Sequence, residues 1–242
     1  MDKNLVPTGI SNFNQYVALS DSSSDRIIMI DTLDGSFFQE ILVEKPVYIN
    51  IRKSRLIIPS FSSDTVFLYR GEDLYPLRYN VQLDRPVAAD AYSMDYHVLV
   101  SQIDHQVILT KSKNDYLRIG EKGNSQGQFN TPSNVTMIDS IIYVVDSGNK
   151  RIQKYDKKGN FVTSFGESEE FIWPSGIAYS DDQIFVSDAK KNEIYIYSLD
   201  GNILQTIRNG INGPTDINYF DDKLFVANLK GPQITILKYL AD

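Results

Sequence analysis

The chain has 242 residues, of which 42% are hydrophobic and 23% are charged, a composition typical of folded proteins and not of disordered or fibrous ones. Its net charge of −7 argues against nucleic-acid binding, because an acidic surface repels phosphate backbones. The absence of cysteine excludes disulfides, thiolate metal sites and cysteine nucleophiles.

We expect no targeting or membrane signal at the start of this chain. Residues 1–6 lack the apolar core of a signal peptide, and no later stretch has the length of a membrane span. We therefore expect no membrane segment. An extracytoplasmic location is favoured only if a signal has been removed from this chain.

The first half of the chain contains three imperfect copies of one strand-rich pattern. Each copy has a proline, then an apolar run, then a β-branched and aromatic run, as expected for paired strands. Pro76 falls in the fourth run of the second copy, where an edge strand tolerates proline. The predicted strands lie at 16–21 and 26–30 after Pro7, 56–60 and 66–69 after Pro46, and 97–101 and 107–109 after Pro86.

The second half repeats the same pattern more regularly. The second strand of a copy ends in Asp or Asn, whose side chain can accept backbone N–H groups of the following turn. Lys158-Gly159 and Asp200-Gly201 then predict hairpins, with glycine supplying a positive φ. The predicted strands lie at 141–146 and 151–155 after Pro132, 184–188 and 193–197 after Pro174, and 224–228 and 233–237 after Pro214.

The repeat length indicates the fold. A period of about forty residues with four short strands per unit is typical of a β-propeller. We predict an all-β chain: a six-bladed β-propeller of four-stranded antiparallel blades, with residues 1–242 as a single domain. The last copy lacks a fourth strand, so either residues 3–6 close the ring or the blade is incomplete in a piece of a longer chain. The blades are predicted to start near Pro7, Pro46, Pro86, Pro132, Pro174 and Pro214.

The segment from Gly120 to Gly166 contains Pro132, the run 143–146, Asn149, Arg151, Ile152, Tyr155, Asp156, Gly159, Phe165 and Gly166. With these residues the segment resembles the NHL repeat family of β-propellers. The next two copies fit this pattern with small departures, such as Asn228 in place of Asp, and the first three copies are degenerate. The resemblance implies a toroid of four-stranded blades around a central channel, and it implies no single activity.

The prolines and the strand-ending Asp residues are expected to lie on one rim of the toroid, and loops on such a rim commonly carry function. Phe171 and Trp173 are nearly adjacent there, Phe129 lies in the long insertion 121–131, and Tyr48 follows Pro46. Tyr and Trp are favoured anchors at binding surfaces. The alternative is that Trp173 and Phe129 pack between blades. For Asp21, Asp146 and Asp188 we expect turn capping and not a ring of metal ligands.

The second residue after each proline should lie near the channel mouth. Only Asn134 and Asp216 among these six are good oxygen ligands, whereas calcium prefers six to eight oxygens. We therefore expect no cofactor, with calcium at these two residues as the alternative. Amidating lyases that resemble NHL propellers hold zinc with three histidines, and the two histidines of this chain, His97 and His105, cannot supply such a site.

The leading functional prediction is a non-enzymatic, NHL-type module that binds a protein or peptide, or acts as a scaffold, through the proline-side rim. Its predicted binding residues are Trp173, Phe171, Phe129, Tyr48, Asn134 and Asp216. The alternative is a propeller hydrolase or lyase that uses a metal site at the channel mouth.

Overall fold

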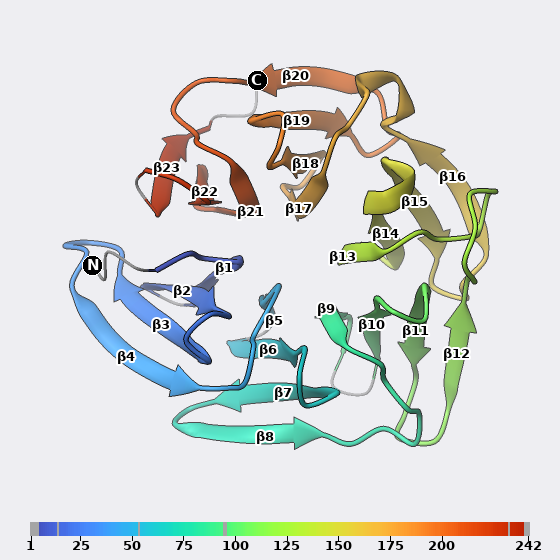
Figure 1. Ribbon diagram of the computed structural model, residues 1–242, viewed down its shortest axis with the longest axis horizontal. Helices are drawn as coiled ribbons and strands as arrows, with labels where there is room; N and C mark the ends of the chain where they lie inside the picture. The colour runs from blue at the N-terminus through green and yellow to red at the C-terminus, as the bar shows by residue number, and fades with distance from the viewer. Residues whose placement is uncertain (1–4, 14, 53, 94–95, 232, 240–242) are drawn as a thin grey trace.

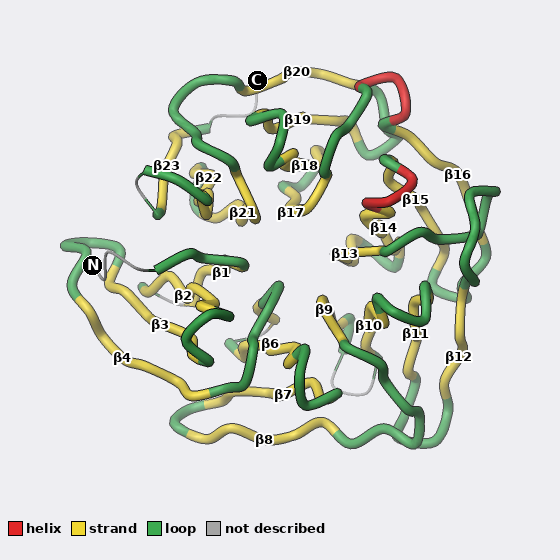
Figure 2. Tube along the Cα trace, viewed as in Figure 1, coloured by secondary structure: helices red, strands yellow, loops and turns green. Residues whose placement is uncertain are grey.

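The computed structural model describes residues 5–13, 15–52, 54–93, 96–231 and 233–239. These residues form six antiparallel sheets arranged radially around a central channel, as Figure 1 shows. The predicted six-bladed propeller is therefore confirmed. Figure 2 shows that strands account for nearly all regular structure, apart from two short 3-10 helices at Ser147–Asn149 and Glu167–Glu169.

The first three blades come from the degenerate half of the sequence, and each still has four strands. Blade 1 contains β1 (Gly9–Phe13), β2 (Tyr16–Asp21), β3 (Arg26–Asp31) and β4 (Phe37–Leu42). Blade 2 contains β5 (Asn50–Arg52), β6 (Arg55–Ser60), β7 (Thr65–Arg70) and β8 (Asp73–Leu77). Blade 3 contains β9 (Pro86–Ala91), β10 (His97–Ser101), β11 (Gln106–Thr110) and β12 (Tyr116–Ile119).

The last three blades come from the regular half. Blade 4 contains β13 (Pro132–Ile138), β14 (Ile141–Asp146), β15 (Arg151–Asp156) and β16 (Phe161–Phe165). Blade 5 contains β17 (Pro174–Tyr179), β18 (Gln183–Asp188), β19 (Glu193–Ser198) and β20 (Ile203–Ile207). Blade 6 contains β21 (Pro214–Phe220), β22 (Lys223–Asn228) and β23 (Ile234–Lys238).

Four of the six repeat prolines are the first residues of innermost strands: Pro86, Pro132, Pro174 and Pro214. A proline is tolerated there because its missing N–H is not needed by the ladder. Pro46 lies before β5 and forms an isolated bridge with Ser60. The proline pattern thus marks where the chain turns from an outer strand to the channel.

The hydrophobic core lies between neighbouring blades, and each of the six blade interfaces has its own cluster of buried residues within the described ranges. Strand β14 shows why the second strands are continuously apolar. Its Ile142 and Val144 belong to the cluster shared with blade 3, whereas Tyr143 and Val145 belong to the cluster shared with blade 5. Successive side chains of a strand point to opposite faces, so this strand contributes to the interfaces on both sides of its blade.

The ring closes by side-by-side packing of blades 6 and 1. Leu5 and Leu19 share a cluster with Phe225, and the Thr215 hydroxyl donates to the Pro7 carbonyl at 2.8 Å. Of the proposed closing strand 3–6, residues 3 and 4 lie outside the described residues, while 5 and 6 are not in a strand. The sheet of blade 6 has three strands in the described part of the chain. No described helix is long and apolar enough to cross a membrane.

Candidate functional site

The innermost strands all start on one face of the ring. In blade 4 Pro132 pairs with Asp146, and in blade 5 Pro174 pairs with Asp188, so each entering loop lies beside the turn that follows the second strand. We call this face, formed by the entering loops and these turns, the proline-side rim. The opposite face carries the turns between the first and second strands, and we call it the hairpin side.

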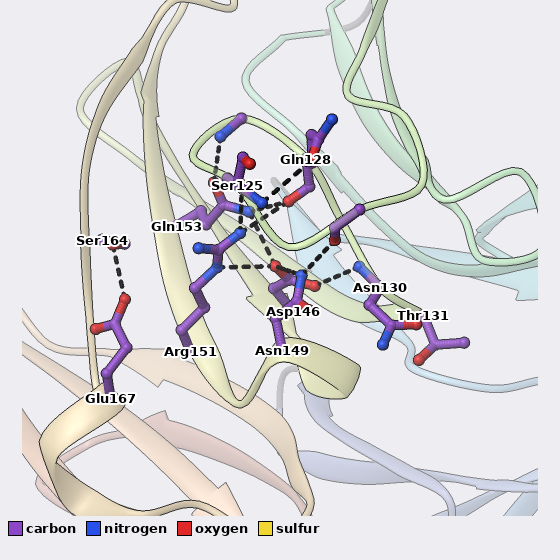
Figure 3. A network of polar contacts seen from close by, with 12 residues as sticks. Ser125, Gln128, Asn130, Thr131, Asp146, Asn149, Arg151, Gln153, Ser164 and Glu167 are labelled. Atoms are coloured by element: carbon purple, nitrogen blue, oxygen red, sulfur yellow. Dashed lines mark hydrogen bonds and ion pairs between the residues drawn. The ribbon is translucent and has the colours of Figure 1, made fainter.

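Asp146 ties the entering loop of blade 4 to the following turn (Figure 3). Its Oδ1 accepts the Asn130 N–H at 2.8 Å, and its Oδ2 accepts from Asn149 Nδ2 at 2.8 Å and from Arg151 Nε at 3.0 Å. Burial raises the pKa of Asp146, and these hydrogen bonds oppose that effect. Asp146 therefore caps the entering loop through a backbone N–H, but it accepts no backbone N–H of the 3-10 turn that follows it. The predicted cap of the following turn is seen in Asp188, whose Oδ1 accepts the N–H groups of Lys190 at 3.1 Å and Lys191 at 2.9 Å.

The long insertion 121–131 is held onto blade 4 and does not stand free. Arg151 Nη2 donates to the carbonyls of Ser125 at 2.7 Å and Gln128 at 3.0 Å, as seen in Figure 3. Phe129 is fully buried in the interface of blades 3 and 4, with its ring centroid 5.8 Å from that of Tyr155. The prediction that Phe129 binds a partner is therefore not supported, because the core already covers its side chain.

Asp188 performs the corresponding task in blade 5 and positions the rim residue Trp173. Its carboxylate accepts the N–H of Ile172 at 2.6 Å and the N–H of Trp173 at 3.1 Å. Ile172 and Trp173 are each 50% exposed. Phe171 is fully buried against Tyr195, at 5.0 Å between ring centroids, so its predicted contact with a partner is likewise not supported.

A cavity of about 460 Å³ opens on the proline-side rim and is lined from blades 2 to 5. Tyr48 and Phe61 of blade 2 line it together with Ile172 and Trp173. The Lys190 ammonium lies 4.7 Å from the centroid of the Trp173 ring. The structure thus brings two predicted residues, Tyr48 and Trp173, into one cavity, which polar residues such as Gln102 and Ser133 also line.

Phe61 carries a second cation on the same rim. The Arg85 guanidinium lies 5.3 Å from the centroid of the Phe61 ring, a distance at which cations interact favourably with aromatic faces. Arg85 and Lys190 are both exposed. Two lining rings of the cavity therefore each hold a solvent-accessible positive charge, although the whole chain is acidic.

Asn134 and Asp216 meet inside the channel and are both buried. Asn134 Nδ2 donates to Asp216 Oδ1 at 3.2 Å, and the Ile10 N–H donates to Asp216 Oδ2 at 3.0 Å. Burial raises the pKa of Asp216 well above its usual range. The hydrogen bonds from Ile10 and Asn134 oppose that effect, and they already engage both carboxylate oxygens of Asp216.

Metal-ligating side chains do not gather elsewhere in the described ranges, where no group of three His, Cys, Asp or Glu residues could hold an ion. His97 begins β10 and is buried, and His105 Nδ1 accepts the Thr131 N–H at 2.9 Å on the rim. The two histidines therefore lie in different parts of blade 3, one buried in a strand and one bonded to the backbone of the rim.

Sequence reasoning missed a charged centre in the channel around Arg52. The Arg52 guanidinium forms two hydrogen bonds of 2.7 Å to the carboxylate of Asp90 and one of 2.7 Å to the Met137 carbonyl. It also donates to the Tyr179 hydroxyl, and its charge lies 5.3 Å from the centroid of that ring. Blades 2, 3, 4 and 5 all contribute to this centre. Asp90, a charged residue inside the otherwise apolar strand β9, is the signal that could have revealed it.

No family model matches the chain, and no curated protein matches it by sequence, so the resemblance to NHL repeats stays a prediction. Solved structures do match. Virginiamycin B lyase from Staphylococcus aureus matches with a TM-score of 0.70 and 16% identity over 100% of this chain and 87% of that chain. A gluconolactonase from Xanthomonas campestris matches with a TM-score of 0.79 and 13% identity over 98% of this chain and 87% of that one.

A β-propeller domain of Cps50 (Swd1) from Myceliophthora thermophila also matches, with a TM-score of 0.66 and 12% identity over 97% of this chain and 84% of that chain. Identities this low show the fold alone. The chain therefore has the six-bladed β-propeller fold, which enzymes and non-enzymes share.

Proposed function

We propose that this chain is a binding module that holds a short segment of another protein in the cavity of the proline-side rim. The observation that carries the proposal is the half-exposed Trp173, which lines one cavity together with Tyr48, Phe61 and Ile172. Large aromatic side chains in a concave surface are the usual anchors of protein interfaces. The backbone hydrogen bonds from Ile172 and Trp173 to Asp188 fix this anchor before binding, which lowers the entropy cost of association.

The charges on the rim define the partner further. Arg85 and Lys190 place positive charge on the rings of Phe61 and Trp173. An apolar side chain in the cavity, flanked by Asp or Glu, would satisfy both the aromatic surface and these cations. We therefore expect an acidic segment with one apolar anchor residue.

Trp173 also provides a direct test, because it is the only tryptophan of the chain. Peptides selected from a random display library on the wild-type protein should contain an apolar residue beside Asp or Glu, and their binding should shift the Trp173 emission. Trp173→Ala should weaken peptide binding about tenfold or more, as loss of an anchor does. Leu204→Ala removes a side chain of similar exposure (54%) from the outer strand β20 and should leave the affinity unchanged.

Two results would contradict the proposal. The first is a set of selected peptides whose affinity is the same for the wild type and Trp173→Ala. The second is calorimetric binding of calcium that disappears in Asp216→Asn, which would favour the alternative enzyme with a channel-mouth metal.

A further inference from the structure

Blade 6 differs from the other five blades at its outer edge. In Figure 1 the fourth strands β4, β8, β12, β16 and β20 form the perimeter of the ring, whereas the sheet of blade 6 ends at β23 within the described part of the chain. An edge strand presents a row of backbone N–H and C=O groups that can pair with a further strand. The outer edge of β23 is therefore a place where a strand can be added.

The five fourth strands are anchored in the same way near the proline-side rim. In each complete blade the second residue of the third strand lies opposite a large apolar residue of the fourth strand, which we call the rim anchor. The rim anchor packs in the cluster that its blade shares with the next one. The five rim anchors are Ile41, Leu77, Ile119, Phe165 and Ile207.

A second apolar residue anchors each fourth strand toward the hairpin side. It lies opposite the fifth residue of the third strand, three or four positions before the rim anchor, and we call it the hairpin anchor. The residue directly before the rim anchor is polar or, in β8, Pro76. The fourth strands of all five complete blades therefore share one pattern of anchors. The hairpin anchors are Phe37, Leu74, Tyr116, Phe161 and Ile203.

Ile234 and Leu237 of β23 occupy the positions that would face these two anchors. Ile234 lies opposite Ala227, the next-to-last residue of β22, as the second residue of each other third strand does in its own blade. In the five complete blades the third-strand residues at both positions are buried, whereas Ile234 and Leu237 are partly exposed. Ile236 between them is 51% exposed. The contact points for a fourth strand are thus present in β23 and open to solvent.

The segments 1–4 and 240–242 are each too short to carry both anchors. In the complete blades the hairpin anchor lies at least six positions before the buried apolar residue of the next entering loop, as Phe37 precedes Val43. Leu5 is that residue for blade 1, and only four residues precede it. At the other end, a hairpin anchor follows the residue it faces by at least five positions, which from Leu237 leaves no residue for a rim anchor. A strand with both anchors therefore comes from outside these 242 residues.

We propose that the outer edge of β23 docks an extended segment of a partner protein, which pairs antiparallel to β23 as the fourth strand of blade 6. The segment carries two large apolar residues three or four positions apart, with a polar residue or proline directly before the second. An acidic residue before the first would face Lys238, as Asp73 faces Arg70 in blade 2. In such strand addition the backbone hydrogen bonds give affinity and the anchored side chains give specificity. This edge is independent of the rim cavity and of the function proposed for it.

A peptide with the sequence of residues 71–79 of this chain is the probe, because β8 carries the whole pattern with Asp73, Leu74 and Leu77. Its Pro76 limits pairing of the peptide with itself. Fluorescence anisotropy of the labelled peptide with the 242-residue chain should show saturable binding at micromolar concentrations. A matched peptide with Leu74→Ser and Leu77→Ser should bind at least about tenfold more weakly, because it loses both apolar contacts.

Amide hydrogen exchange on the wild type locates the peptide, which should increase protection in β23 and not in the rim loop 171–173. The double variant Ile234→Ala, Leu237→Ala shortens two partly exposed side chains and should weaken binding about tenfold. Leu204→Ala, on the outer strand β20, is the matched control and should bind as the wild type does. Trp173→Ala should also leave the affinity unchanged, which separates this edge from the rim cavity.

The proposal is overturned if the wild type shows no saturable binding, if the serine peptide binds equally well, or if the folded double variant binds as the wild type does. New protection on β7 in place of β23 would also overturn it, because the peptide would then replace β8. A dimer in sedimentation whose β23 is already protected would assign the edge to a second copy. Protection of β23 only by a peptide joined through a linker to an end of the chain would assign it to a segment in cis. Either result would end the proposal.

Discussion

The two openings of the channel lie on one scaffold and have different chemistry. The proline-side cavity is built mainly by loops, and its lining combines large apolar residues such as Tyr48, Phe61 and Trp173 with polar ones such as Gln102 and Thr131. A cavity of about 420 Å³ on the hairpin side is built by the innermost strands, and its lining includes Asn50, Asn134 and Asn218. Amide side chains are common there because each innermost strand has one unpaired edge, and the N–H groups of that edge need hydrogen-bond acceptors. Loops, in contrast, satisfy their own backbone through Asp caps and leave side chains free to form a binding surface.

The largest expected effect comes from breaking the channel centre that Arg52 and Asp90 form. Asp90→Ala leaves the Arg52 charge without its partner, and Arg52 is only 26% exposed. Because an unpaired, largely buried charge is costly, we expect a loss of about 3 kcal/mol in the free energy of unfolding, or ~6–12 °C in melting temperature. Thermal unfolding by circular dichroism measures it.

The matched control for Asp90 is Asp104→Ala. Asp104 faces Arg118 at 3.8 Å with 36% of its side chain exposed, so its loss should change stability by less than about 1 kcal/mol. Equal effects of the two substitutions would show that the channel centre is no more important than a surface ion pair.

The next effect comes from removing the Asp188 cap on the rim. Asp188→Ala leaves the N–H groups of Ile172 and Trp173 without their acceptor, which should cost about 1–3 kcal/mol. The loosened loop should also expose Trp173 further and shift its emission to longer wavelength. Denaturant unfolding and fluorescence spectra of the folded variant measure both.

Asp182→Ala is the control for Asp188, since Asp182 is exposed and lies on the hairpin side of blade 5. An unchanged Trp173 spectrum in Asp188→Ala would contradict the view that this carboxylate positions the rim anchor.

The smallest effect is a pH dependence from Asp216. Its pKa is raised by burial, so the unfolded state releases the proton at lower pH than the folded state does. Folding stability of the wild type should therefore fall as the pH rises above about 4. Asp216→Asn does not ionise, so its stability relative to the wild type should increase as the pH rises from about 4 to 7; the loss of one accepted hydrogen bond, from Ile10 or from Asn134, is a cost that does not change with pH. Melting temperatures of both proteins across this range measure it.

A wild type that gains stability relative to Asp216→Asn as the pH rises would contradict this sign. It would mean that the ionised carboxylate is favoured in the folded channel, which would in turn make the channel a better site for a cation.

Much of the fold could be predicted because its signals are local. The repeat of about forty residues, the prolines before innermost strands and the apolar second strands each lie within one blade. The strands predicted in the degenerate copies were also correct, as β6 and β7 show. The second and third strands are buried between blades in every repeat, so each repeat needs apolar residues at these positions. The turn cap of Asp188 was equally accessible, since the N–H groups of Lys190 and Lys191 that it accepts are two and three residues away.

The sites were less predictable because they depend on long-range contacts. Phe129, Phe171 and Trp173 look alike as large aromatic residues near the rim, yet only Trp173 is exposed. Which aromatic side chain is buried between two blades depends on the space between them, and residues of both blades determine that space.

By itself the sequence determined the strands, their order and the proline-marked rim, since hydrophobic period, proline and glycine act within a few residues. Only the tertiary structure decided the channel chemistry. Arg52 reaches Asp90 38 residues away and Tyr179 127 residues away, and Asp216 accepts from Ile10 across 206 residues. Closure of the ring brings these residues together. A local sequence pattern cannot predict which side chains then face one another across the channel.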